Sequence, residues 1–222
     1  MPAPYVEQMV TSGSDVDADR MEAPPLGRRE RKKLEVRQRI VEAAETLFGT
    51  QGVAATTVDQ IGELADVSQT TFFNHFSTKA GLVDALVDDL VVLFDGILER
   101  SRDSDATVAQ TVHVLFHASA ELTEVQHRLL RDVIAETART SSPSARASLA
   151  QMRRGFTDHL AAGQRAGQVR SDREAHLLAD GVLGLYIAVF LFWTTEADYP
   201  VAERLRESAG MAVDLLGAPV RT

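Results

Sequence analysis

TTVDQIGELADVSQTTFFNHFSTK, residues 56–79, is the stretch that decides the fold of this chain. It holds two short helical patterns separated by a turn of about three or four residues, which is the spacing of a helix-turn-helix. Thr57 can cap the first helix, with Gln60 in the reciprocal capping-box position. Asp66 can take the left-handed conformation that ends this helix, and Ser68 can cap the next one.

The second helix of this stretch has an apolar face and a polar face. Phe72 and Phe76 are four positions apart and share the inward face, so we expect them to anchor the helix. Asn and Gln side chains pair with adenine edges, and Thr contacts the thymine methyl group or a phosphate. The alternative is a small polar helix on an ordinary α-helical domain. The opposite face carries Thr70, Thr71 and Asn74, and its flanks carry Gln69, Phe73 and His75.

Residues 34–90 resemble the DNA-binding domain of the tetracycline-repressor (TetR) family of one-component transcriptional regulators. Three positions depart from the family pattern: Gly62 replaces the usual Ala, Asp66 replaces the usual Gly, and Phe73 replaces a common Tyr. Phe73 cannot donate the phosphate hydrogen bond that a Tyr hydroxyl supplies. The positions in register with the family are Ile61, Ala65, Val67, Ser68, Thr71, His75, Phe76, Lys79 and Leu82.

Positive charge is concentrated immediately before the helix-turn-helix. Residues 28–39 hold seven basic and two acidic side chains, a local charge of +5, whereas the whole chain carries −9. Phosphates attract such a segment, and acidic charge elsewhere limits non-specific binding. The alternative is a solvated first helical turn. The residues that we expect to contact DNA are Thr57, Ser68, Gln69, Thr70, Thr71, Phe73, Asn74, His75 and Lys79.

Composition favours a soluble, globular, cytoplasmic protein. The 222 residues are 45% hydrophobic and include no Cys, which excludes a disulfide framework and a thiolate nucleophile. The N-terminal segment resembles no export signal. The most apolar run, residues 181–193, is shorter than the roughly 20 residues that a bilayer requires, so we expect a buried helix and no membrane partner.

The periodicity along the chain predicts an all-α protein of about nine helices. We expect a flexible tail over residues 1–27, a three-helix DNA-binding domain over 28–78, and a helical effector-binding and dimerisation domain over 79–222. The predicted helices span about 29–48, 57–65, 69–76, 79–100, 106–121, 124–137, 144–165, 173–196 and 200–216. The predicted core of the three-helix unit is Ile40, Ala44, Phe48, Val58, Ile61, Leu64, Val67, Phe72 and Phe76.

The last two helices are the predicted dimer interface. Gly181, Gly184 and Ala188 are small residues at roughly helical spacing, which lets a partner backbone come close. Two reading helices related by a dyad would read a palindromic operator. The alternative is that the apolar helix is the central strut of a monomer.

The C-terminal domain holds more aromatic and imidazole groups than its core requires. Resemblance to the family implies a pocket there for a small, mostly apolar effector, although each aromatic residue can instead be core. His113 and His117 are spaced to chelate a metal, but no H-E-x-x-H motif or matching carboxylate accompanies them, so we expect no metal and no cofactor. The candidate pocket residues are His113, Phe116, His117, Met152, Phe156, His159, Tyr186, Phe190 and Trp193.

No catalytic motif is recognisable, so we expect a regulator and not an enzyme. The sequence predicts a homodimeric transcriptional repressor that is released from its operator by an effector. The alternative is a helical small-molecule-binding or interaction protein without sequence-specific DNA binding.

Overall fold

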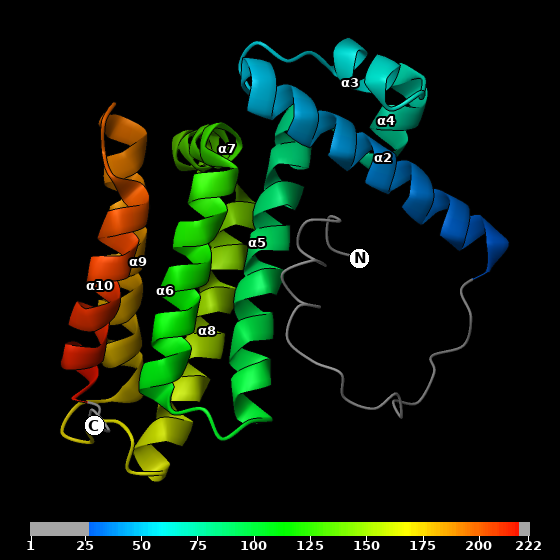
Figure 1. Ribbon diagram of the computed structural model, residues 1–222. Coiled ribbons are helices and arrows are strands. Elements are labelled where there is room, and N and C mark those ends of the chain that lie inside the picture. The colour runs from blue at the N-terminus through cyan, green and yellow to red at the C-terminus, as the bar shows by residue number, and fades with distance from the viewer. Residues whose placement is uncertain (1–26, 218–222) are drawn as a thin grey trace.

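The computed structural model describes residues 27–217, and within them the chain is all-helical, as predicted. Three helices form an N-terminal head, and the others form a bundle beneath it (Figure 1). The predicted tail lies, apart from residue 27, outside the described residues. The nine helices of residues 27–217 are α2 (Arg28–Gln51), α3 (Val58–Leu64), α4 (Gln69–His75), α5 (Lys79–Arg102), α6 (Val108–Val125), α7 (His127–Thr140), α8 (Pro143–Arg165), α9 (Ala175–Thr195) and α10 (Val201–Leu216).

Local caps set the helix-turn-helix, as the sequence predicts. The Thr57 hydroxyl accepts a hydrogen bond from the Gln60 backbone N–H, and the Gln60 side chain accepts one from the Thr57 N–H at 2.9 Å. Asp66 has a φ of 53°, in the left-handed region, and so reverses the chain between α3 and α4. The Ser68 hydroxyl then accepts from the Thr71 N–H at 3.1 Å and starts α4.

The core of the head follows the prediction at most positions but not at Leu64. Ile61 and Phe72 are fully buried, whereas Leu64 is 53% exposed. Helix α3 has only seven residues and ends at Leu64. Position 64 is therefore the last residue of α3, and its side chain faces solvent. Val58 and Val67 are partly buried at the edge of the same core.

The core of the head continues into two helices of the bundle. Leu82, Val83 and Leu86 of α5 belong to it, as do Leu129 and Val133 of α7. The predicted boundary between residues 78 and 79 coincides with the start of α5. Helices α5 and α7 therefore join the head to the remainder of the molecule.

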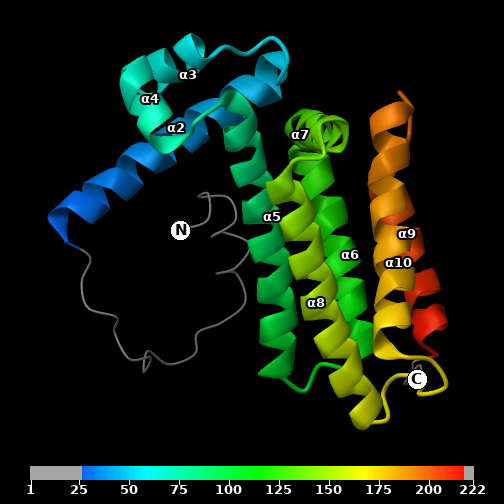
Figure 2. The same cartoon turned by 180° about the vertical axis from the view of Figure 1, so that it is seen from behind.

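The bundle is arranged around α5, α6 and α8, which run along the long axis of the molecule (Figures 1 and 2). Helix α7 crosses their upper end beneath the head, and α9 and α10 lie side by side at the far edge. Among the described residues, α9 is the one helix long and apolar enough to cross a membrane, a test that core helices of soluble proteins also pass. Helix α9 packs against α8, α10 and α7.

Candidate functional site

The outer face of α4 is exposed, while two aromatic rings hold its inner face. Thr70 and Asn74 are exposed, and Phe73 is exposed over half of its surface. Phe72 and Phe76 are buried, with ring centroids 5.9 Å apart. The rings fix the helix in the head, so its polar face is presented outward on a rigid support.

Several residues predicted to contact DNA already have partners within the head. The hydroxyls of Ser68 and Thr71 lie 2.9 Å apart at the N-terminus of α4. The Gln69 side-chain amide donates to the carboxylate of Asp59 on α3. The Thr57 hydroxyl caps α3. The bond between Gln69 and Asp59 joins the two helices, and the other groups cap one helix each.

Lys79 serves as a clamp inside the head. Its ammonium group donates to the backbone carbonyls of Val53 at 2.7 Å and Thr56 at 2.8 Å. These two bonds tie the loop between α2 and α3 to the start of α5. The predicted phosphate contact at this position therefore has at most one N–H of the ammonium group left for it.

The basic start of α2 lies alongside the end of α4 (Figure 2). The Arg37 guanidinium stands 5.0 Å from the centre of the Phe76 ring. Burial lowers the pKa of His75, and the charges of Lys33 and Arg37 lower it further. The exposed face of α4 is thus flanked by cationic side chains, as a surface that binds phosphates requires.

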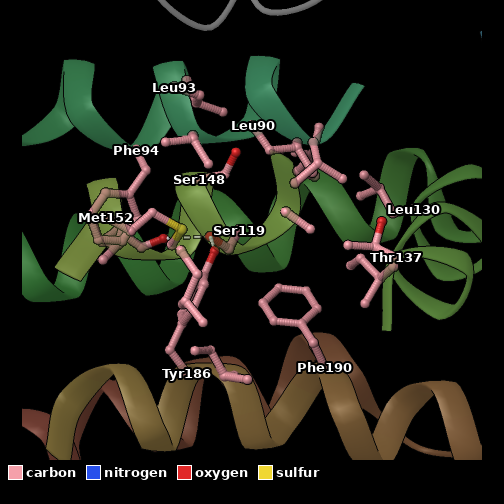
Figure 3. Close-up of a pocket in the computed structure, with 18 of the residues that line it drawn as sticks. Leu90, Leu93, Phe94, Ser119, Leu130, Thr137, Ser148, Met152, Tyr186 and Phe190 are labelled. Atoms are coloured by element: carbon pink, nitrogen blue, oxygen red, sulfur yellow. Dashed lines mark hydrogen bonds between the residues drawn. The ribbon is translucent and has the colours of Figure 1, made fainter. Parts of the chain in front are cut away.

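A cavity of about 360 Å³ lies in the bundle between α5, α6, α7, α8 and α9 (Figure 3). Its walls are mostly aliphatic, from residues such as Leu90, Leu93 and Leu130, and Phe190 projects into it. The hydroxyl groups of Ser119 and Tyr186 meet in the wall of the cavity, 2.7 Å apart. The arrangement can bury a small, largely apolar molecule.

Three of the nine candidate pocket residues line this cavity: Met152, Tyr186 and Phe190. Phe116 and Phe156 do not line it, because they form a fully buried row behind Tyr186 and Phe94. Trp193 is also fully buried, and its indole N–H donates to the His127 imidazole at 3.3 Å.

The three candidate histidines also lie away from the cavity, which corrects their predicted position. His113 and His117 are exposed on the side of α6 opposite Leu115. His159 is buried elsewhere along α8, and its Nε2 atom has no hydrogen-bond partner. Burial and the charge of Arg102 lower the pKa of His159 to about 4.

Helix α7 connects the cavity to the head, a role that the sequence pattern did not reveal. Leu130 lines the cavity, whereas Leu129 packs in the core of the head. The Arg128 guanidinium donates to the carbonyl of Thr50 at the end of α2. The Asp132 carboxylate accepts from the backbone N–H of Val53 at 3.2 Å. One helix thus contacts both the cavity and the base of the head.

A second, much smaller cavity of about 30 Å³ lies at this junction and is bordered by two carboxyl groups, Glu45 of α2 and Asp89 of α5. Burial, together with the charges of Asp89 and Glu42, raises the pKa of Glu45 to about 7. Burial also raises the pKa of Asp89. Leu90 and Leu130 border both this cavity and the large one.

The outer faces of α9 and α10 expose large apolar side chains. Gly184 lies on the exposed side of α9, and no atom lies within 4 Å of the position that a Cβ would occupy there. This surface is therefore open and apolar. Its large apolar residues are Leu177, Ile187, Leu191 and Phe192 on α9, and Met211 and Leu215 on α10.

Residues 40–86 match the family described as bacterial regulatory proteins, tetR family. The regulator TtgR of Pseudomonas putida is 44% identical over 71 residues, which are 32% of this chain and 34% of TtgR, so the match spans about a third of that relative. An uncharacterised regulator of Bacillus subtilis, YhgD, is 25% identical over 179 residues, or 79% of this chain and 89% of YhgD.

Solved structures extend the likeness to the whole fold. FadR of Thermus thermophilus, a TetR-family repressor in complex with lauroyl-CoA, has a TM-score of 0.64 and 25% identity over 84% of this chain and 96% of its own. FadR of Bacillus subtilis, in complex with stearoyl-CoA, has a TM-score of 0.63 and 18% identity over 79% of this chain and 96% of its own. Residues 40–86 therefore match the tetR family of bacterial regulatory proteins, and the described helices as a whole share the fold of solved TetR-family regulators.

Proposed function

We propose that the chain is a homodimeric repressor that binds a palindromic operator through α4 and is released when an apolar effector fills the large cavity. The observation that carries this proposal is the exposed polar face of α4, which is fixed by buried Phe72 and Phe76 and flanked by the basic start of α2. Such a face suits base edges, and the adjoining cations suit phosphates. The site of action is the cytoplasm, and the activity is regulatory and not enzymatic.

Dimerisation through α9 and α10 follows from their exposed apolar surface. Leu191 and Met211 are each exposed over more than half of their area, and Gly184 leaves room for a partner backbone. An apolar surface of this kind marks a protein interface. A dyad through it pairs two copies of α4, and two reading helices can select a palindrome, whereas one contacts too few bases.

The effector is a small, mostly apolar molecule. A cavity of 150 Å³ lined by aliphatic and aromatic side chains holds one benzene molecule, so a cavity of about 360 Å³ holds roughly two such rings or an alkyl chain of similar volume. The two FadR proteins, which share this fold, are in complex with acyl-CoA molecules. Their ligands support an apolar moiety as the part that enters the cavity.

The effector acts on the head through α5 and α7. Both helices border the cavity, and both contribute to the core of the head. Arg128 attaches α7 to the carbonyl of Thr50 near the end of α2, and Asp132 attaches it to the backbone N–H of Val53 just beyond that end. A ligand that favours one position of α7 therefore favours one orientation of the head.

The test is the pair of variants Thr70→Ala and Asn74→Ala, each assayed by gel retardation on the DNA that flanks the gene for this protein. A lost base contact costs about 1–3 kcal/mol, so each variant should bind at least about fivefold more weakly. Unfolding stability should stay within about 0.5 kcal/mol of the wild type because both side chains are exposed. The exposed Glu99 of α5 supplies the control, since Glu99→Ala should leave DNA binding unchanged.

The alternative, a helical small-molecule-binding protein, makes the opposite prediction. Both variants would then retard DNA as the wild type does, with the same dependence on salt. That result would refute α4 as the reading helix.

A further inference from the structure

We propose that the large cavity selects effectors that carry a hydrogen-bond donor, such as a hydroxyl or N–H group, on an apolar body, because the cavity offers acceptors and its own hydroxyl protons are already bonded within the protein. This inference rests on the proposed function of the cavity as the effector site. It adds a rule for the polar group that the effector carries.

The polar part of the cavity wall is a chain of two hydroxyl groups. The Ser119 hydroxyl lies 2.9 Å from the carbonyl oxygen of Leu115 and 2.7 Å from the Tyr186 hydroxyl (Figure 3). A carbonyl oxygen can only accept, and each hydroxyl has one proton. Both bonds form only if Ser119 donates to Leu115 and Tyr186 donates to Ser119. The Tyr186 oxygen then keeps a lone pair that can accept from a ligand.

Tyr186 stays a neutral phenol at this position. Burial raises the pKa of Tyr186 to about 12, while the bond to Ser119 lowers it to a lesser degree. The oxygen therefore remains an uncharged acceptor over the physiological range of pH. A neutral donor is the group that it accommodates without bringing an ion into an apolar space.

The other hydroxyl groups that line the cavity also donate within the protein, and the Ser141 hydroxyl does so by a long bond of 3.5 Å to the carbonyl of Ala138. Thr123 donates to the carbonyl of Ala120 at 2.7 Å, and Thr137 donates to the carbonyl of Val133 at 2.8 Å. Ser148 donates to the carboxylate of Asp88 at 2.5 Å. Their protons are thus unavailable to a ligand unless a bond within the protein breaks.

Among the described residues that line the cavity, Arg146 is the one charged residue, and it is exposed. Its guanidinium donates to the backbone carbonyl of Ser141 between α7 and α8. A carboxylate could meet this cation only at the rim. A carboxylate or ketone placed beside Tyr186 would leave its oxygen unpaired, which costs binding free energy.

Three matched aromatic probes test this rule on the full-length protein by titration calorimetry: biphenyl, biphenyl-4-ol and biphenyl-4-carboxylate. Each has two rings, as the cavity volume of about 360 Å³ requires. The hydroxyl probe should bind about 2- to 10-fold more tightly than biphenyl, the range that one hydrogen bond supplies. The carboxylate probe should bind at least about tenfold more weakly than the hydroxyl probe.

Two variants move the preference in opposite directions. Tyr186→Phe removes the acceptor, so biphenyl-4-ol should lose its advantage over biphenyl. Ser119→Ala removes the partner of the Tyr186 proton, which becomes a free donor, so benzophenone should bind several-fold more tightly than to the wild type. Thr157→Val is the control, because Thr157 of α8 does not line the cavity and its hydroxyl donates to the carbonyl of Arg153 at 2.7 Å.

The results of these titrations test the preference for a hydrogen-bond donor separately from the existence of the effector site. Equal affinity for the three probes, or tightest binding of the carboxylate, overturns the donor rule while leaving the cavity a ligand site. The absence of binding by every probe overturns the proposed effector site and the rule with it. The wild-type series decides the question even if a variant fails to fold.

Discussion

Replacing Glu45 by Gln should stabilise the folded protein above neutral pH. Glu45 of α2 borders the small cavity at the junction of head and bundle, and its pKa is raised from 4.5 to about 7. The folded state therefore prefers the protonated carboxyl group. The stability that this preference contributes is fully present below pH 4.5 and is lost as the pH rises through 7.

The size of the effect follows from this pKa. The interval from 4.5 to about 7 is equivalent to about 3.4 kcal/mol. Water reaches part of the carboxyl group, and solvent screening reduces the effect to about 1–2 kcal/mol. Gln reproduces the neutral form at every pH. Glu45→Gln should therefore raise the free energy of unfolding by this amount at pH 8.5 and by about two fifths of it at pH 5.5.

Urea denaturation at both pH values, at one fixed protein concentration, measures this difference. Glu35→Gln is the matched control, since Glu35 lies on the same helix and is exposed. The control should change stability by less than about 0.5 kcal/mol at either pH. An equal gain for Glu45→Gln at the two pH values, or no gain at pH 8.5, would refute the argument from burial and neighbouring charge.

Three further predictions concern the clamp, the dimer surface and a buried imidazole. Lys79→Met should destabilise the protein by about 2 kcal/mol, because two backbone carbonyls lose a charged donor; an unchanged urea midpoint would show that the clamp contributes nothing. Leu191→Glu should convert the proposed dimer to a monomer in sedimentation, whereas Val92→Glu on α5 should not, although the two side chains are equally exposed at 52% and 53%; loss of the proposed dimer in both would point to general unfolding. His159 has its pKa lowered to about 4, so the wild type loses stability as the pH falls from 6.5 towards 4. His159→Leu should reduce this loss of stability by about 1–2 kcal/mol, a figure that allows for solvent screening. Urea midpoints across that pH range measure the loss, and a variant whose stability falls with pH as steeply as that of the wild type would contradict the prediction.

The helix-turn-helix could be predicted from sequence because local interactions specify it. The caps at Thr57 and Ser68 and the reversal at Asp66 involve residues only a few positions apart. Helical periodicity likewise indicated the order of the later helices. The prediction that Leu64 belongs to the core was wrong, because periodicity does not reveal that α3 ends there and leaves its side chain exposed.

The lining of the large cavity could not be predicted, since it depends on how distant helices pack. Leu90 and Leu130 have the same spacing and composition as core residues, and only the fold shows that space remains beside them. The aromatic residues were a poor guide for the same reason. Phe116 and Phe156 are fully buried in the core and do not line the cavity. The bonds of Lys79 within the head were likewise not predicted, because the carbonyls that it contacts lie more than 20 positions earlier in the chain.

The two leucines that border both cavities have a thermodynamic consequence. Leu90 and Leu130 separate the space for a ligand from the pair of carboxyl groups, Glu45 and Asp89. A guest molecule that pushes these leucines apart admits water to the carboxyl groups and makes them more acidic. Ligand binding in the large cavity would then release protons from these carboxyl groups. By linkage, protonation of the carboxyl groups at lower pH would weaken ligand binding by the same factor.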